Sequence, residues 1–417
     1  MSIALGKYRP VIEDPLKEVT MLTQHHIDVV KSTIPLLASA GTAITDHFYR
    51  RMFSHNPELL DIFNASHQHS GAQKAALFEA IAGYAHHIDD VSALTAVIER
   101  IAQKHTSFNI QAHHYPIVGH HLIETLRELA GDAFTPDVEE AWSAAYGVLA
   151  DVFIAREKAI YSEHLAKQGG WVGERRFIIS QKVPESRWVT SFYLTPEDNQ
   201  AVLAYQPGQY IGIRVKPDTS DVNEVRQYSL SDTPNGQSYR ISVRRENRGD
   251  AGIPGVTSNF LHDDCHVGDS VELYAPAGDF FYIERHVPTV LISAGVGLTP
   301  FQAMLESFAA QKSTQTITYL HACNSVEEHS FKHRVDTLAN QLNLTQHTWY
   351  LEGDTTQQVS IGQMNVVQTS IELPVNDGYF YLCGPVSFMR AINQQLLNLG
   401  VAKERIIYEV FGPHQSL

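Results

Sequence analysis

A histidine in the first third of the chain has the surroundings of a metal ligand. His105 lies on one helical stripe with Ile98, Ala102 and Phe108, where a buried imidazole needs a polar partner. A haem iron would supply that partner, because a single proximal histidine is a common way for a helical protein to hold haem. A core histidine bonded to a backbone carbonyl is the alternative that the residues leave open.

A glutamate later in the same third could act on that histidine. Glu157 continues the apolar stripe of Leu149 and Phe153, and a carboxylate on such a face is costly unless it is paired. The N–H of a metal-bound imidazole would be an economical partner, and this pairing would raise the basicity of the imidazole and fix its orientation. Pairing with the neighbouring Arg156 or Lys158 is the alternative.

Three more side chains could complete a small polar site in an apolar pocket. Tyr115 could join the same set of hydrogen bonds. Tyr49 could place its hydroxyl inside the pocket, and Gln73, one turn before Leu77 on the next helix, could supply a second polar group. The alternative for Tyr49 and Gln73 is the polar surface of an ordinary amphipathic helix.

A glycine-rich turn in the last third could bind a pyrophosphate. Its residues, which follow an apolar strand and precede a helix, are Gly295, Val296, Gly297, Leu298, Thr299 and Pro300. Glycines let the backbone approach the phosphates, and the helix N-terminus favours their negative charge. Proline stands where the full GxGxxG pattern has its third glycine. The acidic pair Glu327 and Glu328 follows the next expected strand without an arginine for a 2′-phosphate, which favours NADH over NADPH.

Two motifs in the middle of the chain could bind a flavin. The first, at the end of an expected strand, consists of Arg226, Gln227, Tyr228 and Ser229. Its arginine could pair with a phosphate, its tyrosine could pack on the ring, and its serine could bond the polar edge of the ring. The second opens a helix near Gly255 and Ser258, where backbone amides could hold a pyrophosphate. A surface strand and an ordinary capped helix are the alternatives.

The bulk composition narrows the class of protein. A chain of 417 residues is too long for one ordinary core, so two or three domains are expected. The net charge of −15 argues against a nucleic-acid partner, because a phosphate backbone needs a basic face. The sequence has no apolar run of about 18 residues that would predict a transmembrane segment. Three cysteines without a CxxC pair fit a reducing compartment such as the cytoplasm.

The spacing of apolar residues divides the chain into three kinds of structure. Residues 21–168 repeat apolar positions three and four apart, which predicts an all-α domain of globin length. Residues 169–285 contain short β-rich runs between turn residues, which predicts an antiparallel β-barrel. Residues 286–417 alternate buried strands with helices, which predicts an α/β nucleotide-binding domain with a parallel sheet. Residues 1–20 are expected to be an N-terminal extension, and Met21 is an alternative start.

Individual elements follow from the same patterns. The strands expected in the barrel are 177–179, 191–194, 210–215, 239–243 and 270–274, with a helix at 259–262. The strands expected in the last domain are 289–293, 316–321 and 378–382, and its helices are 301–310, 331–342 and 386–399.

Taken in order, the motifs of the last two thirds resemble the ferredoxin–NADP reductase superfamily. Besides the motifs above they include the segment 207–210, which ends in Tyr210, the segment 383–385 and the segment 409–412. The resemblance implies FAD in the barrel and NADH or NADPH in the α/β domain, with hydride transfer between them. It also implies that the cofactors contact Tyr210, Glu409, Val410, Phe411, Gly412 and Pro413. Phe411 would be the aromatic near the isoalloxazine, and Glu409 the carboxylate that tunes it.

The N-terminal third makes the resemblance closer. The segments 43–60, 61–64, 101–108 and 141–160 look like the globin domain of the flavohaemoglobins, so that the resemblance covers the chain from about Met21 onward. It implies a proximal haem ligand at His105, with Tyr115 and Glu157 as the partners of that ligand.

The resemblance assigns the other side of the haem as well. It implies that Tyr49 bonds iron-bound O2, that Gln73 and Leu77 line the distal side, and that Phe63 packs on the haem. Lys104, beside the ligand, would influence the haem and flavin environment.

The function implied by the resemblance is that of an NAD(P)H-dependent nitric oxide dioxygenase. In this family NAD(P)H reduces FAD, FAD reduces haem b, and nitric oxide is oxidised to nitrate with O2, which detoxifies nitric oxide. A monomer with O2 and nitric oxide as ligands is expected, and an apolar distal pocket could accept a lipid. Two alternatives stay open, a haem-based sensor of O2 or nitric oxide and a reductase of other acceptors such as lipid hydroperoxides.

Overall fold

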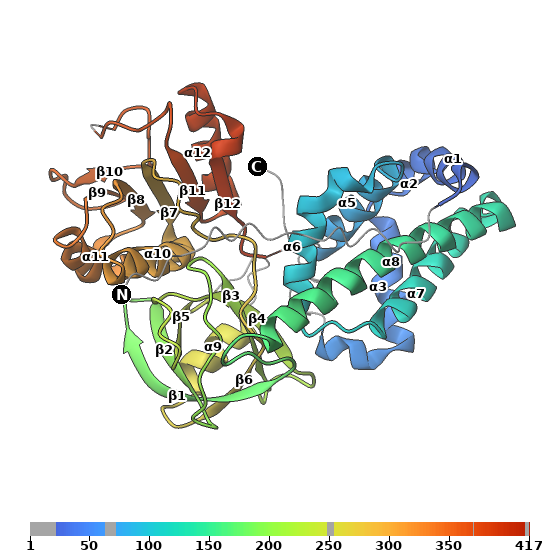
Figure 1. Ribbon diagram of the computed structural model, residues 1–417, viewed down its shortest axis with the longest axis horizontal. Helices are drawn as coiled ribbons and strands as arrows, with labels where there is room; N and C mark the ends of the chain where they lie inside the picture. Colours follow the sequence, from blue (N-terminus) through green and yellow to red (C-terminus); the bar gives the residue numbers. More distant parts are fainter. Residues whose placement is uncertain (1–21, 63–71, 248–253, 370, 413–416) are drawn as a thin grey trace.

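Three domains follow one another along the chain (Figure 1). The computed structural model describes residues 22–62, 72–247, 254–369, 371–412 and 417, without the side chains of residues 72–74. In Figure 1 the helical domain lies on the right, the barrel at the lower left and the α/β domain above the barrel. This is the predicted fold class, an all-α domain followed by an antiparallel barrel and an α/β domain. The domain limits given above remain predictions.

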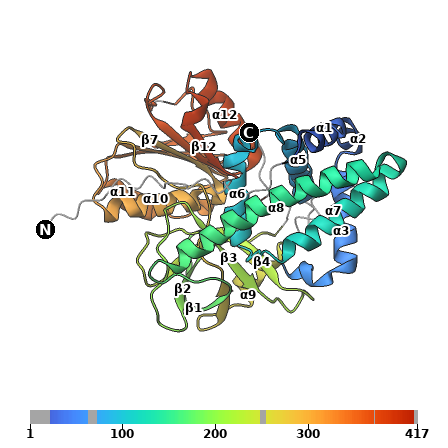
Figure 2. The same ribbon diagram turned by 45° about the vertical axis from the view of Figure 1, so that its right-hand side comes forward.

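The first domain consists of amphipathic helices that bury their apolar stripes against one another. They are α1 (Gln24–Ser32), α2 (Ile34–Ala40), α3 (Ala43–His55), η2 (Pro57–Asp61), α5 (Ala72–His86), η3 (Val91–Leu94), α6 (Thr95–Thr106), α7 (His114–Ala130), η4 (Gly131–Ala133) and α8 (Pro136–Leu165). At the start of α8, Thr135 accepts a hydrogen bond from the backbone N–H of Val138, and Pro136 occupies the first turn, where its missing N–H costs nothing. This helix of 30 residues is about 45 Å long and reaches the barrel (Figure 2).

The helices enclose two apolar clusters. The first, which we call the α3–α5 cluster, includes Phe48, Tyr49, Met52, Ile81 and Ala85. The second, the α6–α8 cluster, includes Ile98, Ala102, Tyr115, Phe153 and Ile160. Partly buried side chains, Ile62, Tyr146 and Leu149 among them, pack against both clusters. The helical domain therefore has two distinct apolar clusters that are bridged by shared side chains.

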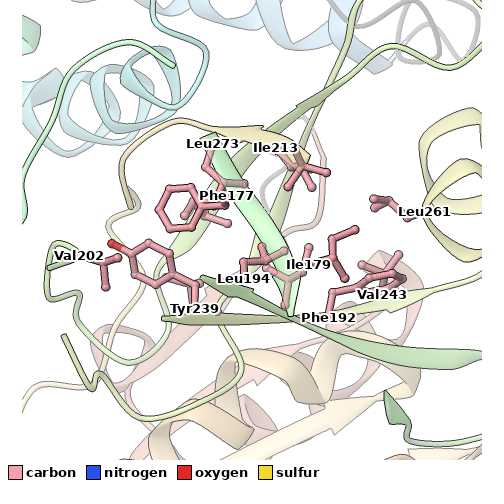
Figure 3. Close-up of a cluster of buried hydrophobic side chains, with 14 of the residues drawn as sticks. Phe177, Ile179, Phe192, Leu194, Val202, Ile213, Tyr239, Val243, Leu261 and Leu273 are labelled. Carbon is pink, nitrogen blue, oxygen red and sulfur yellow. The ribbon is translucent and has the colours of Figure 1, made fainter. Parts of the chain in front are cut away.

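The second domain is a six-stranded antiparallel sheet that curls into a barrel. Its strands are β1 (Arg175–Pro184), β2 (Val189–Pro196), β3 (Tyr210–Val215), β4 (Glu224–Ser229), β5 (Tyr239–Arg244) and β6 (Ser270–Leu273), in the order β4-β3-β6-β1-β2-β5. An isolated bridge between Leu230 and Ile241 brings the two edge strands together. Aromatic and branched residues from alternate positions fill the interior, where Phe177 and Tyr239 lie close together (Figure 3). The helix α9 (Val256–Asp263) adds Leu261 to this core.

The third domain is an all-parallel sheet covered by helices. Its strands are β7 (Thr289–Ala294), β8 (Ile317–Cys323), β9 (Leu344–Tyr350), β10 (Val359–Ile361), β11 (Tyr379–Cys383) and β12 (Ile406–Glu409), in the order β10-β9-β8-β7-β11-β12. Its helical elements are η5 (Gly295–Leu298), α10 (Thr299–Ala310), η6 (Val326–Glu328), α11 (Lys332–Ala339), α12 (Val386–Asn398) and η7 (Lys403–Arg405). The chain leaves β7 toward β8 on one side and returns to β11 on the other. In such a sheet, ligands bind outside the carboxyl ends of the strands at this reversal.

Several predicted elements need correction. The helix expected at 331–342 is shorter at both ends: it ends at Ala339, and it begins after Phe331, whose φ of 58° is a left-handed conformation that cannot form part of the helix. The helix expected at 259–262 begins earlier, at Val256. The strands β9, β10 and β12 had no prediction, because the first mixes polar and apolar residues and the other two are very short.

The helices of the described part of the chain were compared with the length and hydropathy that a membrane span requires. No single helix there is both long enough and apolar enough to cross a bilayer, while one strongly bent pair, Gln24–Ala40 with Ala43–His55, passes by length and composition only. The proposed N-terminal extension at 1–20 lies outside the described residues.

Candidate haem and flavin sites

Three side chains from three helices meet in the helical domain. The Nδ1 atom of His105 on α6 lies 2.7 Å from Oε1 of Glu157 on α8. Tyr115 on α7 donates its hydroxyl to the same oxygen at 2.5 Å, and this hydroxyl also lies 3.2 Å from His105 Nδ1. We call these residues the proximal triad. Glu157 is 2% exposed and Tyr115 8%, so the triad is closed to water on the side of the carboxylate.

The triad determines which imidazole nitrogen can bind a metal. Both hydrogen bonds that the described residues make to the ring of His105 end at Nδ1, so Nδ1 carries the proton and Nε2 is the possible ligand atom. Burial and the negative charge of Glu157 raise the pKa of Tyr115 well above its ordinary value, so this phenol stays a hydrogen-bond donor. The competing sequence interpretation, a pair between Glu157 and Arg156, is wrong, because Arg156 binds Glu99 and Glu163 instead.

Tyr49 occupies the other apolar cluster. It is 5% exposed, its ring stacks on Phe53 with centroids 5.8 Å apart, and it meets Phe48 edge-on at 5.1 Å. Leu77 packs against the same cluster from α5. Gln73 lies on α5 one turn before Leu77, but its side chain is not described, and the predicted haem contact Phe63 lies outside the described residues.

These surroundings fit haem. The imidazole of His105 keeps 33% of its side-chain surface exposed, although its Nδ1 atom is hydrogen-bonded to Glu157. The α3–α5 and α6–α8 clusters supply the two apolar walls that a porphyrin needs, with a phenol in one wall and the imidazole beside the other.

The first flavin-type motif forms the last four residues of β4. Arg226 pairs with the buried Glu224 at 2.8 Å, which holds the guanidinium at the sheet surface. Burial raises the pKa of Tyr228 to about 12, so its hydroxyl stays protonated, and its ring packs against the barrel core. Ser229 pairs with Tyr210, the first residue of β3, so these two predicted flavin contacts are neighbours on the sheet.

The second flavin-type motif leaves a hydroxyl unsatisfied. Gly255 precedes α9, and Ser258 donates to its carbonyl at 3.2 Å. Between them Thr257 is 1% exposed, and its Oγ1 is one of the few buried side-chain atoms of the described residues that lack a hydrogen-bond partner. A buried hydroxyl without a partner, next to a helix N-terminus, fits a phosphate oxygen of FAD. Thr257 belonged to the motif, but the sequence offered no reason to single it out.

The glycine-rich turn lies at the reversal point of the parallel sheet. Gly295 has a φ of 54°, which lets the chain turn sharply after β7. A Cβ on Gly297 would collide with the backbone of Cys383 and Gly384 at the end of β11, so the two loops touch. Val296 and Leu298 complete η5, and Thr299 and Pro300 open α10. The turn therefore offers a backbone that phosphates can approach closely and a helix N-terminus beside it, and this combination fits a dinucleotide pyrophosphate.

The C-terminal segment meets the helix that carries His105. Lys104, next to His105, donates to the carbonyl of Gly412 at 2.7 Å, and burial lowers the pKa of its ammonium group. Burial and the charge of Asp279 raise the pKa of Glu409 to about 8 against the opposing effect of Lys104. Val410 is buried, Phe411 is 45% exposed, and Pro413 lies outside the described residues.

Three polar residues on α6 and at its C-terminal end contact the barrel, and the sequence did not predict these contacts. Ser107 accepts a hydrogen bond at 2.5 Å from the side chain of Gln227 in the first flavin-type motif. Gln103 accepts from the backbone of Gly278 at 3.1 Å, and Arg100 pairs with Asp279 at 3.1 Å. Only the spacing of polar residues three and four apart on α6 could have indicated this face. The helix of the proposed iron ligand is therefore also the main docking element between domains.

Three family models match consecutive parts of the chain. The Globin model matches residues 46–153, the Oxidoreductase FAD-binding domain model matches 176–282, and the Oxidoreductase NAD-binding domain model matches 291–394. A protein from Vibrio cholerae serotype O1 named Flavohemoprotein is 59% identical over 397 residues, which cover 95% of this chain and 100% of that protein. The chain belongs to the flavohemoprotein family.

Other relatives agree with this membership. A Flavohemoprotein from Chromobacterium violaceum is 45% identical over 401 residues, or 94% of this chain and 99% of that protein. A flavohemoglobin from Malassezia yamatoensis, solved with bound FAD and heme, has 27% identity and a TM-score of 0.83 over 94% of this chain and its own whole length. A solved FAD/NAD-binding domain of a nitric oxide dioxygenase from Vibrio cholerae has 52% identity and a TM-score of 0.54, and it covers 59% of this chain and 100% of that one.

Membership settles the general chemistry of this chain. It is an NAD(P)H oxidoreductase, and haem, FAD and a nicotinamide nucleotide are its cofactors. The globin fold holds the haem, the barrel the flavin and the parallel sheet the nucleotide. The individual site residues stay predictions.

Proposed function

We propose that this chain is a nitric oxide dioxygenase, which uses NAD(P)H and O2 to convert nitric oxide to nitrate and so detoxifies nitric oxide. The observation that carries the proposal is the proximal triad, a buried carboxylate bonded to the proposed haem ligand in a chain with its own reductase domains. An oxygen carrier needs only reversible binding, whereas a strongly electron-donating ligand favours oxygen chemistry. The similar solved domain of a nitric oxide dioxygenase from Vibrio cholerae supports the same activity.

The triad residues would tune the iron from the proximal side. When bound, haem supplies the iron at which O2 and nitric oxide react, and FAD supplies its electrons from NAD(P)H. Glu157 accepts a hydrogen bond from Nδ1 of His105, which leaves Nε2 as the atom that would hold the iron and would make the imidazole a more basic ligand. Tyr115 donates to the same carboxylate oxygen and so holds it in place.

Further residues would complete the sites. Tyr49 would donate a hydrogen bond to a ligand that becomes partly negative, with Gln73, Leu77 and Phe63 lining the same side. The proposed flavin contacts are Tyr210, Arg226, Gln227, Tyr228, Ser229, Gly255, Ser258 and the segment that starts at Glu409, and the turn at 295–300 would hold the nucleotide. The preference for NADH, a monomeric state, a cytoplasmic location and a lipid in the distal pocket are proposals of the same kind.

The activity itself can be measured by stoichiometry. Purified full-length protein is supplied with NADH, O2 and nitric oxide together, and then with O2 or nitric oxide alone. A dioxygenase yields about two nitrate ions per NADH consumed, because each nitric oxide needs one electron and the coenzyme carries two. NADH consumption without nitrate, or equal consumption with lipid hydroperoxide or a ferric chelate, would instead indicate a reductase of other acceptors.

The proximal triad can be tested by itself. Glu157→Gln should lower nitrate formation by about 10-fold to 100-fold, the usual effect of removing a carboxylate behind a metal-bound histidine. Tyr115→Phe should have a smaller effect, because the carboxylate stays. The iron–histidine stretching frequency, measured by resonance Raman spectroscopy, should fall in the glutamine variant. If that variant forms nitrate at the normal rate, the triad does not act on the reaction.

A further inference from the structure

Three charged side chains, two of them buried, form a cluster where the barrel meets the α/β domain, away from the proximal triad. They are Arg240 on β5, Glu306 on α10 and Arg334 on α11. Arg240 is 7% exposed and Glu306 6%, and charged residues are rarely buried to this degree unless they are paired. We call this group the interdomain cluster.

Glu306 lies at the centre of the cluster. Arg334 donates to it twice, from Nε to Oε1 at 2.8 Å and from Nη2 to Oε2 at 2.5 Å. Gln302, one turn earlier on α10, donates to Oε1 at 2.8 Å. Burial by itself would raise the pKa of Glu306, but these hydrogen bonds and the charge of Arg334 lower the pKa below its ordinary value. The carboxylate is therefore ionised and bonded on both oxygens.

Arg240 brings the barrel to this carboxylate. Its Nη2 atom lies 3.9 Å from Glu306 Oε1, and the same guanidinium donates to the backbone carbonyl and hydroxyl of Ser231. It also lies over the ring of Phe331, 5.1 Å from the centroid. Phe331 is the residue with the left-handed φ just before α11, a conformation that persists only where the surroundings hold it.

The two ends of the cluster lie next to the two cofactor motifs. Ser231 follows the flavin motif by two residues, and its N–H donates to the carbonyl of Arg240 at 2.9 Å. Glu306 lies about two turns after Thr299, where α10 starts at the nucleotide turn. A second contact, from Ser307 to Thr233 at 3.2 Å, joins the same two segments.

We propose that Arg240 and Glu306 are positioning residues for hydride transfer, because they lock the nucleotide-bearing helix α10 to the strand end that carries the flavin motif. In that reaction a hydride with its electron pair leaves the reduced nicotinamide, which becomes NAD(P)+, and joins the flavin, which becomes reduced. Hydride transfer is sensitive to small changes in donor–acceptor distance. The inference rests on the family's NAD(P)H oxidoreductase chemistry and not on the proposed reaction with nitric oxide.

The test is the rate of flavin reduction in the full-length protein without oxygen. Glu306→Gln should reduce the flavin at saturating NADH at least about fivefold more slowly, while the half-saturating NADH concentration changes less than about twofold. The kinetic isotope effect with NADH deuterated at the transferred position should rise, because hydride transfer becomes slower than every other step. The conservative variant Glu306→Asp should restore part of the rate.

Controls separate positioning from a general loss of stability. Asp336→Asn removes the ion pair of Asp336 with Lys332 inside α11, and should leave both the rate and the isotope effect unchanged. In calorimetry, the two reductase domains should unfold at more widely separated temperatures in Glu306→Gln than in the Asp336→Asn control. If Glu306→Gln fails to fold, Arg334→Gln takes its place, because the side chain of Arg334 is 45% exposed and its loss is easier to tolerate. This variant should show the same slower flavin reduction. A normal rate and isotope effect in the folded variant would overturn the proposal.

Discussion

The haem side and the reductase side of this molecule build their sites in opposite ways. The proximal triad joins side chains that lie 10 and 52 residues from His105 along the chain, on three different helices. The flavin and nucleotide motifs are instead continuous segments at strand ends, and in the nucleotide turn the proposed binding groups are mostly backbone amides next to glycines. The comparison indicates that the haem site depends on a few polar side-chain atoms, while the nucleotide site depends on how closely a ligand can approach the backbone. The following predictions test that difference, from the largest effect to the smallest.

Removing the proposed iron ligand should affect the haem site alone. His105→Ala should lose nearly all haem and lower nitrate formation more than about 100-fold, since it removes the proposed proximal ligand. FAD content and the reduction of an artificial electron acceptor by NADH should stay unchanged. The visible spectrum and the haem-to-FAD ratio provide the measurement. A haem-loaded variant with normal activity would show that another residue holds the iron.

Adding one methyl group should affect the reductase site alone. In Gly297→Ala the new Cβ would collide with the backbone of Cys383, so stability should fall by about 1–3 kcal/mol and the nucleotide turn should shift. Flavin reduction by NADH should slow, while the haem spectrum stays normal. The matched control is Gly147→Ala, a helical position with open space around its Cβ, which should be neutral or stabilising. Equal stability of both variants would contradict the expected contact.

The carboxyl group of Glu409 should titrate where the two regions meet. Its folded-state pKa of about 8 lies above the ordinary value of 4.5, so the folded protein holds a proton that the unfolded chain has lost. Stability should therefore decline as the pH rises from about 4.5 to about 8, and Glu409→Gln should remove this part of the decline. Unfolding curves at several pH values, compared between the two proteins, measure a difference that approaches one proton. Parallel curves would show that the carboxyl titrates normally.

The smallest effect should come from the docking face of α6. Ser107→Ala removes the hydrogen bond that Ser107 accepts from Gln227, worth about 0.5–1.5 kcal/mol, and the one that it donates to the carbonyl of Lys104, and should slow haem reduction by flavin about twofold to fivefold. Flavin reduction by NADH should not change. Ser180→Ala, at an exposed position on β1, is the control. If haem reduction is equally fast in both variants, this bond does not set the electron-transfer geometry.

Much of the fold could be predicted from local patterns. Helical periodicity, short alternating runs and buried strands each produce a recognisable spacing, and they predicted the three kinds of domain in the right order. Elements without a clear period were missed, as with the three-residue β10. The helix expected at 331–342 is present as the shorter α11, and its start is set by the left-handed Phe331, whose ring lies under Arg240, a residue distant in sequence.

By itself the sequence determined the family, the cofactor motifs and the candidate site residues, because these depend on residue types in a fixed local order. Only the tertiary structure decided that Glu157 bonds His105 rather than Arg156, that Ser107 docks on the flavin motif, and that two arginines enclose Glu306. Each of these contacts joins segments far apart in the chain. Their energies depend on distances and burial that no local pattern contains.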